Sequence, residues 1–217
     1  MKNDIAQLIG AVAREVDSRE VDGKPARVII ATRVYDANVD DVWDALTSAE
    51  RIPRWFLPIE GDLRVGGRYQ IKGNASGTIT QCEPPQRLAL TWEYGGGISW
   101  VSVQLAEAEG GGTRLELEHV AHVEDGLWDQ FGPGAVGVGW DLAIMGLGKH
   151  LEGGAGVDPE QAAAWGGSEE GKAFMRASSE DWRQASIAAG TDEAAATAAA
   201  ARTTAFYTGE SAPATES

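Results

Sequence analysis

The amino-acid sequence predicts an α+β fold in which a curved antiparallel sheet of about seven strands surrounds a long helix, followed by a helical extension. Between residues 59 and 123, segments of alternating apolar and polar residues are separated by turns rich in glycine and proline, as in an antiparallel meander. After them, residues 131–151 repeat apolar side chains at the period of a helix. Because each strand has one apolar face, only one face of the sheet is expected to pack against the helix.

The composition is that of an acidic protein with an ordinary core. The chain has 217 residues, of which 43% are hydrophobic. With a net charge of −15, the protein is not expected to be attracted electrostatically to nucleic acid or to an anionic membrane. The single cysteine, Cys82, excludes an internal disulfide and fits a reducing compartment. No signal peptide is recognisable, so we expect a cytoplasmic protein.

Residues 1–25 are predicted to form an amphipathic helix and a linker. Over residues 4–16 the apolar side chains fall on one helical face, namely Ile5, Leu8, Ile9, Val12 and Val16. The segment VDSREVDGKPA that follows is polar and rich in turn formers, as a linker is. Arg27–Tyr35 is rich in β-branched residues and is predicted to be the first strand.

Two short helices are expected next. Asn38 can cap the first helix, and Asp40 and Asp41 suit the positive end of its dipole. The second helix is expected around Pro53, with Trp55 at its end.

Six strands then follow in the prediction, and their alternation assigns an inner face to the sheet. The predicted strands are residues 59–63, 68–72, 77–82, 87–94, 99–107 and 113–123. On the last three strands the inner rows are Leu88, Leu90, Trp92 and Tyr94, then Val101, Val103 and Leu105, then Leu115, Leu117, His119 and Ala121.

The long helix carries glycine at positions 137, 139, 146 and 148. Each glycine lowers helix stability by about 1 kcal/mol relative to alanine. Two compensations fit: another part of the chain passes very close, or the helix forms one wall of a partly empty space. The same stretch contains a formal dinucleotide fingerprint, GPGAVG, but it lacks the flanking strands that nucleotide binding needs. Asp141 and Lys149 make it a poor membrane helix.

An extension follows a glycine-rich break at residues 153–156. Residues 168–188 and 192–207 are predicted to be helices, and the last residues a disordered tail. The two helices carry aromatic side chains that a floating tail would not expose, so we expect them to pack onto the domain or onto a second copy or protein partner. The predicted organisation is therefore a domain over residues 26–153 and an extension over residues 154–217.

Four segments carry a family resemblance: ATRVYDANVDDVWDALTSAERIPRWF, GDLRVGGRYQI, GTITQCEPPQRLALTWEY and GGTRLELEHV. On the basis of these segments, the chain from Arg27 to Leu151 resembles the SRPBCC superfamily, with its START-like and birch-pollen-allergen-like helix-grip fold. Within it the chain is most similar to the family named for the activator of heat-shock-protein-90 ATPase, C-terminal domain. The resemblance implies a hydrophobic cavity between the sheet and the long helix, and no common catalytic set. The glycine-rich helix and the extension depart from the family pattern, and the glycines favour a cavity.

Few side chains in the sequence indicate chemistry. His119 and His122 point to opposite faces of a strand and cannot share a metal, and no zinc set or cofactor motif is present. No catalytic residue is assigned. His119 lies in the inner row, either as a core histidine bonded to a backbone carbonyl or as a polar anchor for a ligand. Trp100 is expected either near the cavity or facing outward. The candidate ligand-binding residues are Trp92, Val101, Val103, Leu117, His119, Trp140, Ile144 and Leu147.

The leading hypothesis is that the protein binds a small apolar or amphipathic molecule in the cavity, without catalysis. A second hypothesis is a protein-interaction module like the chaperone-ATPase activator that names the family. A third is a cyclase or hydrolase acting on an aromatic or polyketide-like substrate, for which His119 is the inward-facing acid–base candidate.

Overall fold

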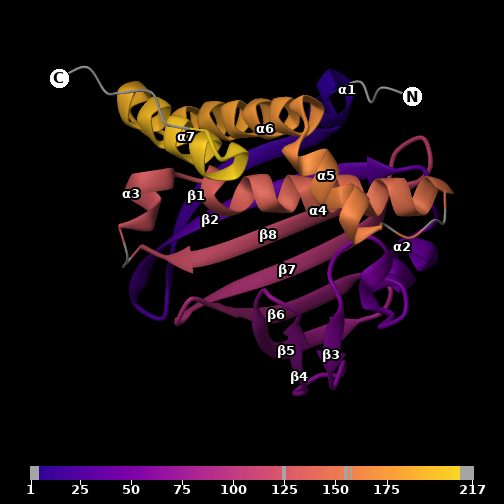
Figure 1. Cartoon of the computed structure of the whole chain (residues 1–217). Helices are drawn as coiled ribbons and strands as arrows, with labels where there is room; N and C mark the ends of the chain where they lie inside the picture. The colour runs from indigo at the N-terminus through magenta and orange to yellow at the C-terminus, as the bar shows by residue number, and fades with distance from the viewer. Residues whose placement is uncertain (1–4, 124–125, 154–155, 157, 211–217) are drawn as a thin grey trace. The chain divides into compact units, whose positions relative to one another are not determined.

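The computed structural model describes residues 5–123, 126–153, 156 and 158–210 (Figure 1). Eight strands form one antiparallel sheet in the order β1-β2-β8-β7-β6-β5-β4-β3. The predicted α+β helix-grip fold is confirmed, with one strand more than the seven expected. The expected disordered tail lies outside the described residues. No helix among the described residues has both the length and the apolar character needed to cross a membrane.

The chain divides into two compact units. The first unit comprises residues 1–31, 122–142 and 158–217, and the second comprises residues 32–121 and 143–157. The long helix α4, Gly134–Gly153, contributes residues 134–142 to the first unit and its remaining residues to the second.

The second unit contains the predicted meander. Its strands are β3 Ile59–Gly61, β4 Arg68–Ile71, β5 Ser76–Glu83, β6 Arg87–Tyr94, β7 Gly97–Glu107 and β8 Thr113–His122. Each pairs antiparallel with the next along the chain, as short turns require. These bounds differ from the predicted ones by at most two residues at each end.

The two predicted short helices are also present in the second unit. Helix α2, Val39–Thr47, begins at the expected cap, where Asn38 Oδ1 accepts a hydrogen bond from Asp41 N at 2.8 Å. The second helix is a single 3-10 turn, η1 Ile52–Arg54. Trp55 Nε1 donates to Ala45 O at 2.9 Å, which ties the end of η1 to α2.

The prediction for the N-terminus, an amphipathic helix over residues 4–16 and a linker, is confirmed for a short helix at its start and is wrong for the rest. Helix α1 covers only Ile5–Gly10, and β1, Val12–Val21, continues through a tight turn into β2, Lys24–Tyr35. Asp22 and Gly23, inside the expected linker, have φ angles of 51° and 75°. Positive φ at both central residues is the geometry of a type I′ hairpin turn, for which Asp-Gly is a favoured sequence. The helical spacing of Val12 and Val16 is an even number of residues, so it fits one face of a strand equally well.

Both predicted helices of the extension are confirmed, as α6 Glu169–Ala188 and α7 Glu193–Thr208. A further helix, α5 Pro159–Gly167, precedes them, and α3 Leu127–Phe131 precedes α4. Within the first unit α6 packs against α1, β1, α5 and α7. Phe174 and Trp182 are almost completely buried there. The extension therefore packs onto other parts of its own chain, one of the expected alternatives.

A buried polar cluster connects three elements of the first unit at Asp141. Asp141 Oδ2 on α4 accepts hydrogen bonds from Arg14 Nε on β1 at 2.9 Å, and from Ser178 Oγ and Trp182 Nε1 on α6 at 2.5 and 3.1 Å. Burial raises the pKa of Asp141, while Arg14 and the two other donors oppose that shift. Because removal of one partner would leave a buried charge uncompensated, this cluster fixes α4 against β1 and α6.

The glycines of α4 make room for close neighbours. A Cβ atom at Gly137 would lie 2.4 Å from Trp182 Cε2, and one at Gly146 would lie 2.5 Å from the carbonyl oxygen of Trp55. At Gly148 the nearest atom is Arg33 Nη2 at 2.8 Å, and at Gly139 it is Tyr207 Oη at 3.2 Å. Close approach therefore compensates for the glycines, and they give no support for a cavity along this helix.

We expect Gly137→Ala to destabilise the protein by about 1–3 kcal/mol, because the new methyl group overlaps the buried Trp182 ring. In an open helix the same change would stabilise by up to about 1 kcal/mol. Gly153→Ala is the control, since no atom lies within 4 Å of its added Cβ. Urea unfolding measures both variants. A Gly137→Ala protein as stable as the parent would contradict the close-packing explanation.

Candidate functional site

The candidate site is the inner face of three neighbouring strands in the second unit. Strand pairing aligns Leu90 with Val101 and Val101 with His119, and in the adjacent row Leu88 with Val103 and Val103 with Leu117. Residues paired across an antiparallel sheet share a face, so these side chains form one surface. Of the sequence-predicted site residues, the structure brings five together here: Trp92, Val101, Val103, Leu117 and His119.

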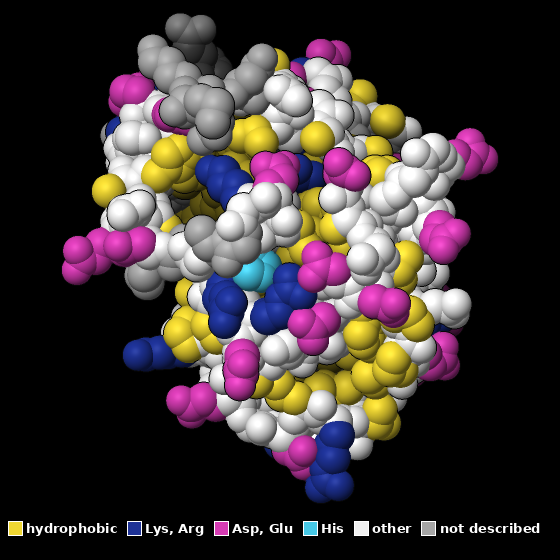
Figure 2. All heavy atoms as spheres, turned by 90° about the vertical axis from the view of Figure 1, so that its right-hand side faces the viewer, with side chains coloured by type: hydrophobic (Ala, Val, Ile, Leu, Met, Phe, Trp, Pro, Cys, Tyr) yellow, Lys and Arg dark blue, Asp and Glu magenta, His cyan; other side chains and the backbone are white. Residues whose placement is uncertain are grey.

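The side chains of this surface become less buried from β8 to β6. Val101, Val103 and Leu117 are buried, whereas Leu88, Leu90 and Trp92 on β6 are only half-buried. The half-buried row continues into an apolar cluster around Tyr69, Ile71 and Ile79, against which these partly buried side chains pack: Phe56, Leu57, Ile59, Leu63, Cys82, Leu88, Leu90 and Trp92. Figure 2 shows hydrophobic side chains gathered around a hollow in the lower part of the molecule, at the height of β3–β6 in Figure 1.

A polar pair lies inside this apolar surface. His119 Nε2 is 2.7 Å from Ser99 Oγ, and Ser99 Oγ donates to Trp92 O at 3.1 Å. The Trp92 ring lies beside the imidazole, with 6.3 Å between ring centroids. His119 therefore contacts a serine hydroxyl of the neighbouring strand, whereas the sequence interpretation of a core histidine named a backbone carbonyl as its partner.

Burial lowers the pKa of His119 to about 4, because the protonated imidazole would lose its hydration in apolar surroundings. The ring is therefore neutral at physiological pH. A neutral imidazole can donate one hydrogen bond and accept another, which suits it to bind a hydroxyl or carbonyl group.

Two further predicted residues, Ile144 and Leu147, lie on the second-unit part of α4 and are 3% and 1% exposed. Tyr35 Oη donates to Ile144 O at 2.9 Å, and Arg33 Nη1 donates to the same carbonyl at 3.3 Å. Burial raises the pKa of Tyr35 far above its usual range, so its hydroxyl remains a donor. The eighth predicted residue, Trp140, is half-buried and belongs to the first unit.

Sequence reasoning missed two residues of this face. Ser99 pairs with Trp92 and Ala121 and so joins the inner row two positions before Val101. Cys82, paired with Leu88, joins the apolar cluster. Alternation through Val101 could have found Ser99. The same alternation puts Trp100 on the opposite face, which decides between the two positions considered for it.

Among the residues that the structure describes, no three His, Cys, Asp or Glu side chains converge as metal ligands. The chemistry of the inner face therefore rests on a neutral histidine, a serine hydroxyl and a partly covered apolar surface.

A family model matches residues 36–152, which is more than half of the chain and includes the meander and α4. It describes the activator of Hsp90 ATPase homolog 1-like proteins. The chain belongs to this family. No curated protein shows detectable similarity to it.

Solved structures show a similar fold in other family-like proteins. The crystal structure of CalU16 from Micromonospora echinospora is 38% identical, with a TM-score of 0.65, and the match covers 83% of this chain and 99% of that one. Its solution structure gives 40% identity and a TM-score of 0.67, covering 83% and 97%. Protein MLL2253 from Mesorhizobium loti is 22% identical, with a TM-score of 0.52 and coverage of 58% and 97%, and shows the fold alone. The CalU16 match extends beyond residues 36–152, so it includes part of the N-terminal or C-terminal additions.

The lowered pKa of His119 predicts a pH-dependent stability. The unfolded chain takes up a proton near pH 6.5 and the folded protein only near pH 4, so stability is lost as the pH falls between these values. The loss is about 3 kcal/mol at most. Denaturant unfolding from pH 7.5 to 4 measures it, with His119→Gln as the comparison.

Other titrating groups are common to both proteins, so the difference between the two pH profiles reports His119. The parent is expected to lose stability more steeply than the His119→Gln variant over this range. Parallel profiles would show that His119 is not buried in its neutral form.

Proposed function

We propose that this protein binds a small apolar or amphipathic molecule on the inner face of β6, β7 and β8, without catalysis. The observation that carries the proposal is the half-buried row on β6. Leu88, Leu90 and Trp92 face inward by strand pairing, yet the described residues leave them partly uncovered. A bound apolar ligand would remove that surface from water, at about 25 cal/mol for each Å² buried.

The His119–Ser99 pair supports an amphipathic ligand. Ligand pockets are mostly apolar, with a few placed polar groups that fix the orientation of the ligand. Here a hydroxyl opposite Trp92 and a neutral imidazole opposite Val101 lie in a surface that is otherwise apolar. A ligand with one hydroxyl group could donate a hydrogen bond to the remaining lone pair of Ser99 Oγ and place its hydrocarbon against β6.

The same geometry favours binding over acid–base catalysis. A general base works best when its pKa lies near the operating pH, and burial lowers that of His119 to about 4. Ser99 Oγ lies 3.1 Å from Trp92 O as well as 2.7 Å from His119 Nε2, so its hydroxyl can donate to a backbone carbonyl as well as to the imidazole. The pair therefore acts as a hydrogen-bonding anchor in this proposal.

The proposal predicts uptake of Nile red, a neutral dye whose emission shifts to the blue in apolar surroundings. We expect the parent protein to bind the dye and Leu88→Gln to weaken binding about tenfold or more, because the amide must be desolvated beside the ligand. Ala89→Gln is the matched control. It introduces the same side chain at the next position of β6, where the side chain points to the opposite face.

Fluorescence titration gives the three affinities, and unfolding curves show whether the variants are folded. Absence of dye binding by the parent, or an equal loss in the Leu88 and Ala89 variants, would contradict a site on the inner face.

A further inference from the structure

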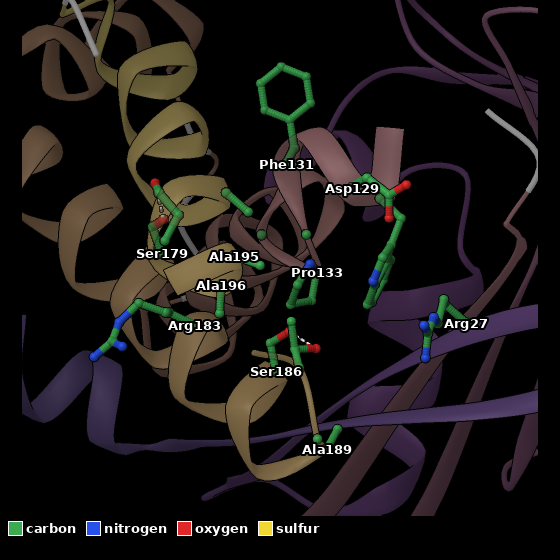
Figure 3. Close-up of a pocket in the computed structure, with 17 residues that line it drawn as sticks. Arg27, Asp129, Phe131, Pro133, Ser179, Arg183, Ser186, Ala189, Ala195 and Ala196 are labelled. Atoms are coloured by element: carbon green, nitrogen blue, oxygen red, sulfur yellow. Dashed lines mark hydrogen bonds between the residues drawn. The ribbon is translucent and has the colours of Figure 1, made fainter. Parts of the chain in front are cut away.

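A second concave site lies wholly within the first unit. An open pocket of about 360 Å³ is lined by α3, the start of α4, α6 and α7, with Arg27 of β2 at one side (Figure 3). This volume falls in the range of small-molecule sites. The pocket shares no residue with the inner face of β6–β8. The proposed function does not use it.

Small side chains keep the pocket open. Ser179 and Ser186 of α6 lie across from the alanines of α7, and the α3–α4 junction contributes glycine and proline; the small lining residues are Gly132, Pro133, Gly134, Ala189, Gly190, Ala195, Ala196, Ala199 and Ala200. In Figure 3, Pro133, Ser186 and Ala196 border the same space. The alanine-rich α7, which has no strong amphipathic pattern of its own, thus has a role as a pocket wall.

Hydrogen bonds from α7 hold the α3–α4 junction in place. Thr203 Oγ1 donates to Phe131 O at 2.8 Å, and Tyr207 Oη donates to Ala135 O at 2.9 Å. Arg202 donates to the carbonyl oxygens of Gln130 and Asp129. The bonds to Asp129, Gln130 and Phe131 satisfy carbonyl groups that the C-terminal end of α3 leaves unpaired, and the bond to Ala135 ties α7 to the first turn of α4. The walls of the pocket are therefore held in place before a ligand arrives.

The charge around the pocket favours an anion. The Arg27 guanidinium stacks over the Trp128 ring at 5.5 Å and donates to Ser18 Oγ, and no acidic side chain of the described residues forms an ion pair with it. Arg183, by contrast, is held by both carboxylate oxygens of Glu180, at 2.8 and 2.6 Å. Gly134, the first residue of α4, also lines the pocket, and the N-terminal end of a helix carries positive potential.

We propose that this pocket binds a compact aromatic carboxylate. The carboxylate lies toward Arg27 and the N-terminus of α4, and the ring lies between Trp128 and the alanines of α7. Taking about 30 Å³ for each water-sized group, 360 Å³ holds roughly a dozen non-hydrogen atoms, which fits two fused rings and one carboxylate. Asp129 at the rim disfavours a second negative charge on the ligand.

The test is calorimetric titration of the full chain with 2-naphthoate and with its neutral analogue, 2-naphthalenemethanol. We expect 2-naphthoate to bind at least tenfold more tightly than the alcohol. Arg27→Gln should remove most of this preference, whereas Arg19→Gln, the same change of charge on the exposed part of β1, should leave it intact.

A second pair of variants assigns the binding to this pocket. Ala195→Leu places a larger side chain at the pocket wall, and Ala194→Leu makes the same change at the next exposed position of α7, which does not line it. We expect Ala195→Leu to weaken 2-naphthoate binding at least tenfold and Ala194→Leu to have little effect.

Three results would overturn the proposal: no binding of 2-naphthoate, equal binding of the acid and the alcohol, or binding that Ala195→Leu leaves unchanged. The last result, combined with a loss in Leu88→Gln, would move the naphthoate to the inner face of β6–β8. Failure of Nile red binding alone would leave this pocket unaffected, so the two proposals fail independently.

Discussion

The close approach of neighbouring groups to the glycines of α4 is the constraint on which the rest of the structure depends. Trp182 contacts the helix at Gly137 and the Trp55 carbonyl contacts it at Gly146, at distances that a Cβ atom would not permit. At Gly148 the Arg33 guanidinium lies so close that an added Cβ would displace it. Beside these contacts, Asp141 collects the donors of Arg14, Ser178 and Trp182, and the carbonyl of Ile144 accepts from Tyr35. The lower helix propensity of glycine is thus offset by packing and hydrogen bonds that a bulkier helix could not make.

Because its glycines are covered by neighbouring groups, α4 does not provide the wall of the cavity expected along it. The proposed ligand site lies on the sheet instead, where Leu88, Leu90 and Trp92 are half-buried beside the neutral His119. The pocket of the first unit has a different origin, because alanines and glycines leave its space open and Arg27 supplies charge. The ligands that we propose for the inner face and for the pocket therefore differ in chemistry.

Much of this architecture could be predicted from local patterns. The alternation of β6–β8 assigned Val101, Leu117 and His119 to one face, and the strand register agrees. The N-terminus was mispredicted because Val12 and Val16 fit both a helix and one face of a strand, and the Asp22-Gly23 turn signal was read as a linker. The partners of Asp141 and Ser99, and the side chain that covers Gly137, are distant in sequence, so no local pattern could supply them.

The most direct test of the account is the alkylation rate of Cys82, the single thiol, which is half-buried in the apolar cluster beside Leu88. Iodoacetamide labelling followed by mass spectrometry measures this rate with and without saturating Nile red. The account predicts that Cys82 reacts in the free protein and that the bound dye slows the reaction at least tenfold, because the dye covers the same surface. A protein that binds the dye while Cys82 reacts at an unchanged rate would contradict the central claim that the inner face of the sheet is the ligand site.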